Sequence, residues 1–326
     1  MATLRETRDR IRSVNSTKKI TKAQELIATS RITKAQQRVE ATQPYAVELK
    51  DVMSRLAAAS SLDHPMLRER ENAKLAAVLV VTSDRGMCGG YNNNVLKRAH
   101  ELEEHLEESG YDVVRYVTGK KGVGFLDFRD LQIAGSWTDF SENPELDSIR
   151  AIGEHLVKGY IASAEDEVEW QEGLHAPEGQ PVRGFDQVHV VYTEFESMLS
   201  QQPRVQRLLP IEIVYEDDEF SPPEMKESVG SGDISPDMDF EPDPDTLLDA
   251  LLPQYFLRTL FQIYLESSAS ESAARRNAMK SATDNATELV KDLTRIANQA
   301  RQAQITQEIT EIISGAGALS DSGESD

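Results

Sequence analysis

The chain has 326 residues, with 35 lysines and arginines against 56 aspartates and glutamates, and its formal net charge is −21. This acidity excludes a generally basic nucleic-acid-binding protein, whereas 39% apolar and 28% charged residues allow a folded core. The single cysteine, Cys88, excludes an internal disulfide and a thiolate zinc cluster. No run of about 18 apolar residues is present, so we expect no direct membrane insertion, and we expect neither a metal nor a cofactor.

The first part of the chain, residues 1–60, predicts one long helix. Its first proline is Pro44, and the first glycine of the chain is Gly86. A heptad pattern places two sets of residues at the core positions of a coiled coil. One set is Leu4, Ile11, Lys18, Glu25, Ile32 and Val39, and the other is Thr7, Val14, Thr21, Ala28 and Ala35. The resulting seam is small and partly polar, so a partner helix could approach closely.

The middle of the chain, residues 73–215, predicts an α/β domain. Short apolar runs at 74–82, 112–118, 131–137 and 187–194 are typical of strands, and 94–108 and 145–164 have helical patterns. Strands that alternate with helices favour a doubly wound, largely parallel sheet of Rossmann-like type.

Two acidic segments interrupt this pattern, the insertion 165–184 and the linker 216–245. Residues 165–249 carry 23 acidic and four basic side chains, which is most of the excess negative charge. We expect both segments to be solvated loops or disordered insertions. The first 58 residues have a net charge of +6, so the N-terminal helix predicts an acidic neighbour.

The end of the chain, residues 246–314, predicts a second long helix, followed by a polar tail at 315–326. Pro253 should kink this helix or mark its beginning. Apolar residues spaced three and four apart predict a seam facing the N-terminal helix. They are Met279, Ala282, Ala286, Leu289, Leu293, Ile296, Ala300 and Ala303, after which the pattern shifts to Ile305, Ile309 and Ile312. Both ends could therefore form an antiparallel coiled coil.

The glycine-rich segment 83–92 lies between a predicted strand and a predicted helix. This is a place where α/β proteins bind phosphate on free backbone amides, so a nucleotide-binding enzyme is one hypothesis. The segment lacks the G-x-G-x-x-G and Gly-Lys-Ser/Thr spacings, and a tight turn needs glycine for structural reasons alone. Cys88 could be a nucleophile, but a small buried thiol is the simpler interpretation. A coiled-coil scaffold with an α/β head is the third hypothesis.

Three motifs resemble one known family. Residues 11–23, IRSVNSTKKITKA, resemble the N-terminal helix of the gamma subunit of F-type ATP synthases, and 83–92 resembles that family's SDRGLCGG segment. Residues 270–280 and 300–312 resemble the family's C-terminal helix. The motifs occur in order and cover nearly the whole chain.

The resemblance implies a rotating central-stalk subunit that carries no catalytic residue. The paired helices would stand inside the ring of alpha and beta subunits, and the α/β domain would contact the epsilon subunit and the membrane rotor c-ring. A subunit of this kind would couple ion-driven rotation to ATP synthesis. With one cysteine and no transit peptide, we expect a bacterial protein at the cytoplasmic face of the plasma membrane.

The matching motif positions also imply particular site residues. Those expected to contact the ring are Lys22, Gln24, Arg275, Arg301, Gln302 and Thr306. Those expected in a collar turn near the base of the catalytic subunits are Asp84, Arg85, Gly86, Cys88, Gly89 and Gly90.

Overall fold

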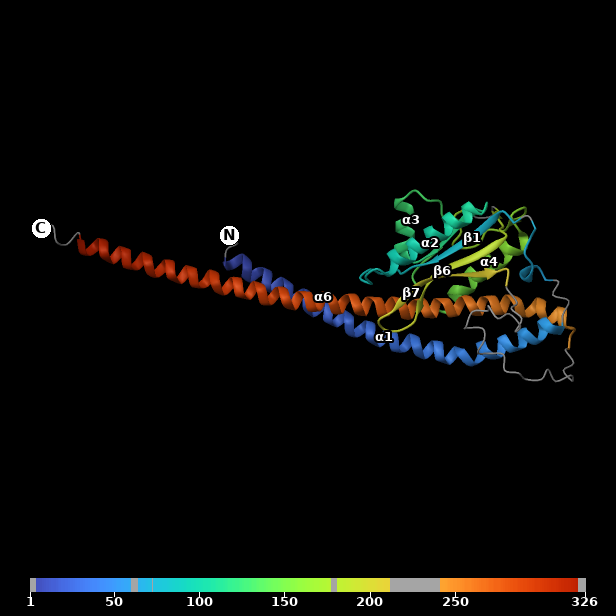
Figure 1. Cartoon of the computed structure of the whole chain (residues 1–326), viewed down its shortest axis with the longest axis horizontal. Coiled ribbons are helices and arrows are strands. Elements are labelled where there is room, and N and C mark those ends of the chain that lie inside the picture. The colour runs from blue at the N-terminus through green and yellow to red at the C-terminus, as the bar shows by residue number, and fades with distance from the viewer. Residues whose placement is uncertain (1–3, 60–63, 72, 177–180, 212–240, 322–326) are drawn as a thin grey trace. The chain divides into compact units, whose positions relative to one another are not determined.

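The computed structural model describes residues 4–59, 64–71, 73–176, 181–211 and 241–321 (Figure 1). The chain divides into two compact units, one of residues 1–27 with 276–326 and the other of residues 28–275. Most of the predicted linker 216–245 and the end of the tail lie outside the described residues.

Two long helices span both units, α1 (Leu4–Ala59) and α6 (Pro244–Asp321). The helices of the α/β domain are α2 (Tyr91–Glu108), α3 (Lys120–Phe128) and α4 (Leu146–Ala162), with a short 3₁₀ turn at Pro65–Leu67. Its strands are β1 (Leu75–Val81), β2 (Asp112–Thr118), β3 (Gly135–Trp137), β4 (Glu167–Val168), β5 (Val182–Arg183), β6 (Gln187–Phe195) and β7 (Gln201–Leu209).

The main sheet has the strand order β3-β2-β1-β6-β7. The strands β3, β2, β1 and β6 are parallel, and only β7 runs antiparallel, against β6. The predicted fold class is therefore confirmed. Sequence patterns missed α3 and β7, and the strand expected at 131–137 is limited to Gly135–Trp137.

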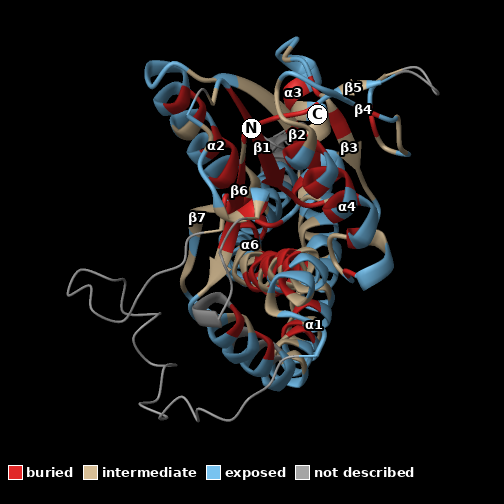
Figure 2. Ribbon diagram, turned by 90° about the vertical axis from the view of Figure 1, so that its right-hand side faces the viewer, coloured by how far each residue is buried: buried red, intermediate tan, exposed pale blue. Residues whose placement is uncertain are grey.

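Alternate side chains of β1 enter two separate apolar cores, one on each face of the sheet. Ala76, Val78 and Val80 pack with α2 and α3. Leu75, Ala77, Leu79 and Val81 pack with α4 and with residues 248–264 of α6, and Leu56 of α1 joins this second core. Because β1 is buried on both faces, its sequence is continuously apolar (Figure 2).

The start of α6 is fixed by its N-cap and not by Pro253. The carboxylate of Asp243 accepts hydrogen bonds from the Thr246 amide at 3.0 Å and from its hydroxyl at 2.8 Å. Pro244 occupies the first helical position, where a missing N–H costs nothing. Pro253 lies inside the helix, so the expectation that it marks the helix start is wrong.

The described part of the acidic insertion 165–184 is packed against the domain. Val168 and Leu174 are buried, and the Ser136 amide donates to the Gly173 carbonyl at 2.8 Å. Gly173 has φ +95, and a Cβ there would lie 2.2 Å from Nε1 of Trp137. The expectation of a wholly solvated loop is wrong, because the segment covers the edge beyond β3 while its carboxylates face outward.

In the unit formed by residues 4–27 and 276–321, α1 and α6 pack along a narrow seam. Thr21 and Thr283 share a hydrogen bond of 2.7 Å. Because the helices run antiparallel, seven-residue steps from this pair place Thr7 level with Ala297. Both residues are buried, as the predicted α1 register requires.

The predicted seam of α6 is correct at every second position only. Met279, Ala286 and Leu293 are buried, but Leu289 and Ile296 are each 43% exposed. The intervening seam positions are Thr283, Val290 and Ala297, one residue further along. Ala303 is exposed because it lies past the level of Leu4, where the described part of α1 begins.

No helix among the described residues is long and apolar enough to cross a membrane.

Asp186 connects three separate segments of the α/β domain. Its carboxylate accepts hydrogen bonds from the amides of Lys74 at 2.8 Å, Leu75 at 3.1 Å and Ala164 at 3.2 Å, and pairs with Arg70 at 3.1 Å. Burial works against ionisation, but these bonds outweigh it and hold the pKa of Asp186 below its ordinary value.

We therefore predict that Asp186→Asn lowers the free energy of unfolding by about 3 kcal/mol at neutral pH. A lowered folded-state pKa gives stability that is present above the unfolded pKa, about 4, and is lost as pH falls through the folded value. Urea unfolding of both proteins from pH 7 to pH 2.5 should show their difference shrinking below about pH 4. A difference that stays constant with pH would contradict this account.

We also predict that Leu174→Ala destabilises the chain by about 2 to 3 kcal/mol, because it empties a buried site under the insertion. The control, Glu169→Ala, changes an exposed residue of the same segment and should stay within about 0.5 kcal/mol of the parent. Equal urea midpoints for the two variants would mean that the segment does not stabilise the fold.

Candidate functional site

The first two backbone amides of the turn between β1 and α2, those of Ser83 and Asp84, are bonded within the protein. The Ser83 amide donates to Asn92 Oδ1 at 2.9 Å, and the Asp84 amide donates to Ser141 Oγ at 2.9 Å. The Asp84 carboxylate accepts from the amides of Lys120 at 3.1 Å and Ser141 at 3.0 Å. A carboxylate therefore already occupies the N-terminus of α3, where a phosphate would otherwise bind.

Cys88, Gly89 and Gly90, at the end of the turn, also have structural roles. Cys88 is 3% exposed, and its Sγ accepts a hydrogen bond from Asn92 Nδ2 at 3.3 Å. Gly89 has φ +59, and Gly90 is the N-cap of α2. Cys88 is thus a small buried thiol, which favours the simpler of the two sequence interpretations.

The cavity beside this turn is too small for a nucleotide. It lies between the carboxyl ends of β1 and β2 and residues 264–271 of α6, and its volume is about 10 Å³. This is the space of roughly one water molecule.

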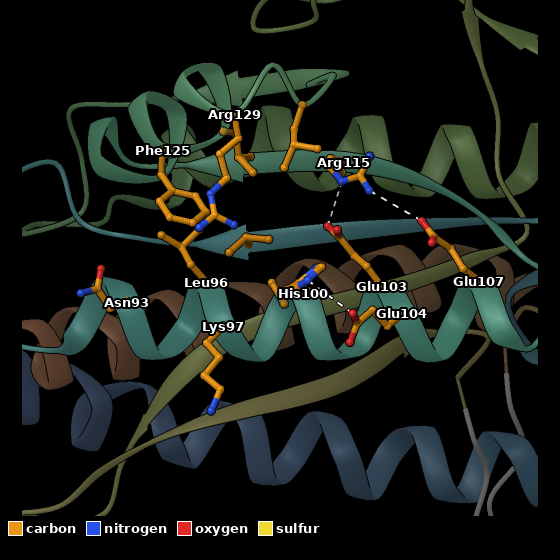
Figure 3. Close-up of a pocket in the computed structure, with 14 residues that line it drawn as sticks. Asn93, Leu96, Lys97, His100, Glu103, Glu104, Glu107, Arg115, Phe125 and Arg129 are labelled. Atoms are coloured by element: carbon orange, nitrogen blue, oxygen red, sulfur yellow. Dashed lines mark ion pairs between the residues drawn. The ribbon is translucent and has the colours of Figure 1, made fainter.

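A much larger groove, of about 880 Å³, lies between α2 and α3 (Figure 3). Arg115 pairs with Glu103 at 3.0 Å and with Glu107 at 3.8 Å, and His100 lies 3.4 Å from Glu104. Burial raises the pKa of Glu103, although Arg115 opposes this shift. The ionisable groups of the groove are mostly engaged with one another, which leaves no arrangement typical of acid–base catalysis.

Arg275 lies in a buried ionic junction. It is 4% exposed, and its guanidinium contacts the Glu271 carboxylate at 2.6 Å. It also donates to the carbonyls of Arg85 and Gly86, both at 3.3 Å, and lies 3.4 Å from Glu142. Burial alone would lower the pKa of Arg275, but the carboxylates raise it above its ordinary value, so the group stays charged. The guanidinium of Arg275 is therefore bonded to groups of this chain.

The other expected ring-contact residues belong to the helical unit. Lys22 is exposed and pairs with Glu25 at 3.1 Å, and Gln24 is half-buried. Arg301, Gln302 and Thr306 are exposed on α6. Since Thr21 lies level with Thr283, Arg301 is 18 residues further along, or about 27 Å at 1.5 Å per residue. These residues therefore form two separate groups, one of Lys22 and Gln24 on α1 and one of Arg301, Gln302 and Thr306 on α6.

The comparisons with known proteins cover the whole chain. A family model described as ATP synthase matches residues 3–319. A protein from Corynebacterium glutamicum named ATP synthase gamma chain is 69% identical over 326 residues, which is 100% of both chains. Another of that name, from Saccharopolyspora erythraea, is 55% identical over 323 residues and 99% of both chains.

The chain belongs to the ATP synthase gamma family.

Solved structures of ATP synthases have the same fold as this gamma-family chain. One, of the Euglena gracilis mitochondrial ATP synthase (OSCP/F1/c-ring), has a TM-score of 0.61 at 18% identity and covers 99% of this chain and 96% of its own. The Tetrahymena thermophila central stalk and c-ring structure has a TM-score of 0.53 at 21% identity and covers 81% and 99%.

Sequence reasoning missed Glu142, Glu271 and Arg31 of the buried junction. Glu271 and Arg275 are four residues apart, a spacing that predicts a pair on one helix face. No comparable signal marks Glu142, because its partners come from segments far away in the sequence.

We predict that Cys88→Ser leaves ATP turnover of the assembled complex within about twofold of the parent, because a serine oxygen can also accept the Asn92 hydrogen bond. The measurement is ATP hydrolysis by purified complexes that contain the variant. A complete loss of activity in intact complexes would instead require a chemical role for the thiol.

Proposed function

We propose that this chain is the rotating shaft of an F-type ATP synthase and carries no catalytic group of its own. It would couple the rotation of an ion-driven rotor ring to ATP synthesis in the catalytic ring. The observation that carries this proposal is the antiparallel pairing of α1 and α6 along a seam of small residues, in a chain 69% identical to an ATP synthase gamma chain over its full length.

A noncatalytic role is supported by the state of the candidate chemical groups. The amides of Ser83 and Asp84 are bonded within the chain, and Cys88 is buried. The nucleotide-binding enzyme hypothesis loses its site for this reason. No observation favours the scaffold hypothesis over the shaft, because both explain the same coiled coil.

The proposed partners are the alpha and beta subunits around the helical unit, and the epsilon subunit and the c-ring at the α/β domain. Large apolar side chains stay exposed on the helical unit, among them Ile20, Leu26, Leu289 and Ile296. We take these exposed apolar side chains as positions where a surrounding protein wall would contact the helical unit. The complex would lie at the cytoplasmic face of a bacterial plasma membrane.

Co-purification tests this assignment. A tag on this chain should recover a membrane-bound ATPase with its ring and rotor subunits, and the isolated chain should bind no nucleotide. Recovery of the chain alone from membranes with an intact ATPase would overturn the proposal.

We propose that Arg301, Gln302 and Thr306, with Lys22 and Gln24 in a separate group, contact the ring. Replacing Arg301 and Gln302 together by alanine should lower ATP turnover by about tenfold, which corresponds to about 1.4 kcal/mol of lost interaction. The loss is expected only if the contacts form in some rotary states and not in others.

The matched control is Arg295→Ala with Gln299→Ala, an exposed pair of the same residue types slightly earlier on α6. Hydrolysis rates are compared in complexes of verified subunit composition. If both double variants have the same turnover, Arg301 and Gln302 have no specific role in the ring contact.

A further inference from the structure

One carboxylate, that of Glu142, pairs with arginines from three parts of the unit 28–275. Arg31 comes from α1, Arg85 from the turn after β1 at 3.1 Å, and Arg275 from α6 at 3.4 Å. The Glu142 side chain is 18% exposed and that of Arg275 is 5% exposed, so solvent screens this pair less than a surface pair, whereas the Arg85 side chain is 68% exposed. Glu142 itself lies in the loop between β3 and α4, which belongs to the α/β domain.

The surroundings of Glu142 fix its position. The Ser268 hydroxyl of α6 donates to the Glu142 carbonyl at 3.1 Å, and Glu271 holds Arg275 at 2.6 Å. The preceding residue, Ser141, exchanges two hydrogen bonds with Asp84, of 2.9 and 3.0 Å. The backbone of Glu142 is therefore attached to both the domain and α6, and its carboxylate is held by the arginines.

This junction is mainly ionic, whereas the other contact between the domain and α6 is mainly apolar. Residues 248–264 of α6 pack on the sheet through apolar side chains such as Leu252, Phe256 and Leu260. Apolar burial opposes separation but has no direction, whereas ion pairs and hydrogen bonds fix orientation. Leu260 and Arg275 are 15 residues apart, or about 22 Å along the helix. A second, directional attachment at that distance prevents the domain from pivoting on the first.

We propose that Glu142 is a positioning residue that fixes the α/β domain against both long helices, so that torque passes between them with little angular slack. The inference rests on the proposed shaft function. Within it, Glu142 acts through Arg31, Arg85 and Arg275 and touches neither nucleotide nor ion. Rotation without load needs little stiffness at this junction, whereas ATP synthesis against load needs more.

The test uses Glu142→Gln in the whole membrane complex, with Glu145→Gln as the matched control. Glu145 lies in the same loop but is exposed and makes no side-chain cap on α4. We expect Glu142→Gln to lower ATP synthesis driven by a proton gradient by about threefold or more, while hydrolysis with an uncoupler stays within about 1.5-fold of the parent. Glu145→Gln should leave both rates unchanged.

A second readout reports stiffness directly. A probe attached to the α/β domain, in complexes whose catalytic ring is arrested, should show an angular variance about twofold larger in Glu142→Gln than in the parent or the control. A purely stabilising role would change the yield of complexes but not this variance. Equal variance in parent and variant would overturn the inference.

If Glu142→Gln does not assemble, Arg31→Gln with Arg85→Gln removes two of the three pairs while Arg275 still neutralises the carboxylate. The same increase in variance is then expected, and its absence would again contradict the proposal. Failure of the shaft function is distinguishable, because the parent chain would then not be recovered with the complex or its probe would not rotate with ATP.

Discussion

The close approach of two helices along a seam of small side chains is the constraint on which the rest of this structure depends. Thr21, Thr283, Ala286 and Ala297 are small enough for the backbones to come near each other, and the Thr21–Thr283 hydrogen bond sets the register. The two helices have 56 and 78 residues, and their sequences alone would not keep either one stable as an isolated helix. Each helix is stabilised by the other. The part of α6 that extends beyond the level of Leu4 has none of the described residues of α1 beside it and depends on whatever surrounds it.

The α/β domain is attached to the helices by two kinds of interaction that meet different needs. The apolar core formed with residues 248–264 of α6 supplies cohesion, because burial of apolar side chains is favourable. The ionic junction around Glu142 and Arg275 buries charges, which is costly unless every charge is paired. A buried network of this kind is retained more readily for the unique geometry that it specifies than for stability.

Much of this fold can be predicted from local patterns, and the exceptions have physical causes. The continuous apolar run of β1 and the heptads of α1 are visible in the sequence because burial dictates them directly. Helix α3 is not visible in the sequence, because Gly122 and Gly124 disfavour a helix. Packing requires the first of these glycines, since a Cβ on Gly122 would lie 2.6 Å from Thr82 Oγ1. Strand β7 contains Pro203 and is polar, which only its position at a sheet edge allows. The buried role of Arg275 depends on Glu142, which no local pattern connects to it.

The seam of α6 shows how a local rule can select the wrong side of a helix. Spacing by hydrophobicity chooses Leu289 and Ile296, whereas the structure buries Ala297 and half-buries Val290, each one residue further along. A large residue in place of Thr283 would separate the helices at this level and remove the Thr21–Thr283 hydrogen bond. Outside the seam, Leu289 and Ile296 add exposed apolar side chains, which make no directional bonds, to the helix surface. Such a surface can turn inside a protein wall without breaking a fixed set of hydrogen bonds at each step, so the feature that misleads the heptad pattern is the one that a rotating shaft requires.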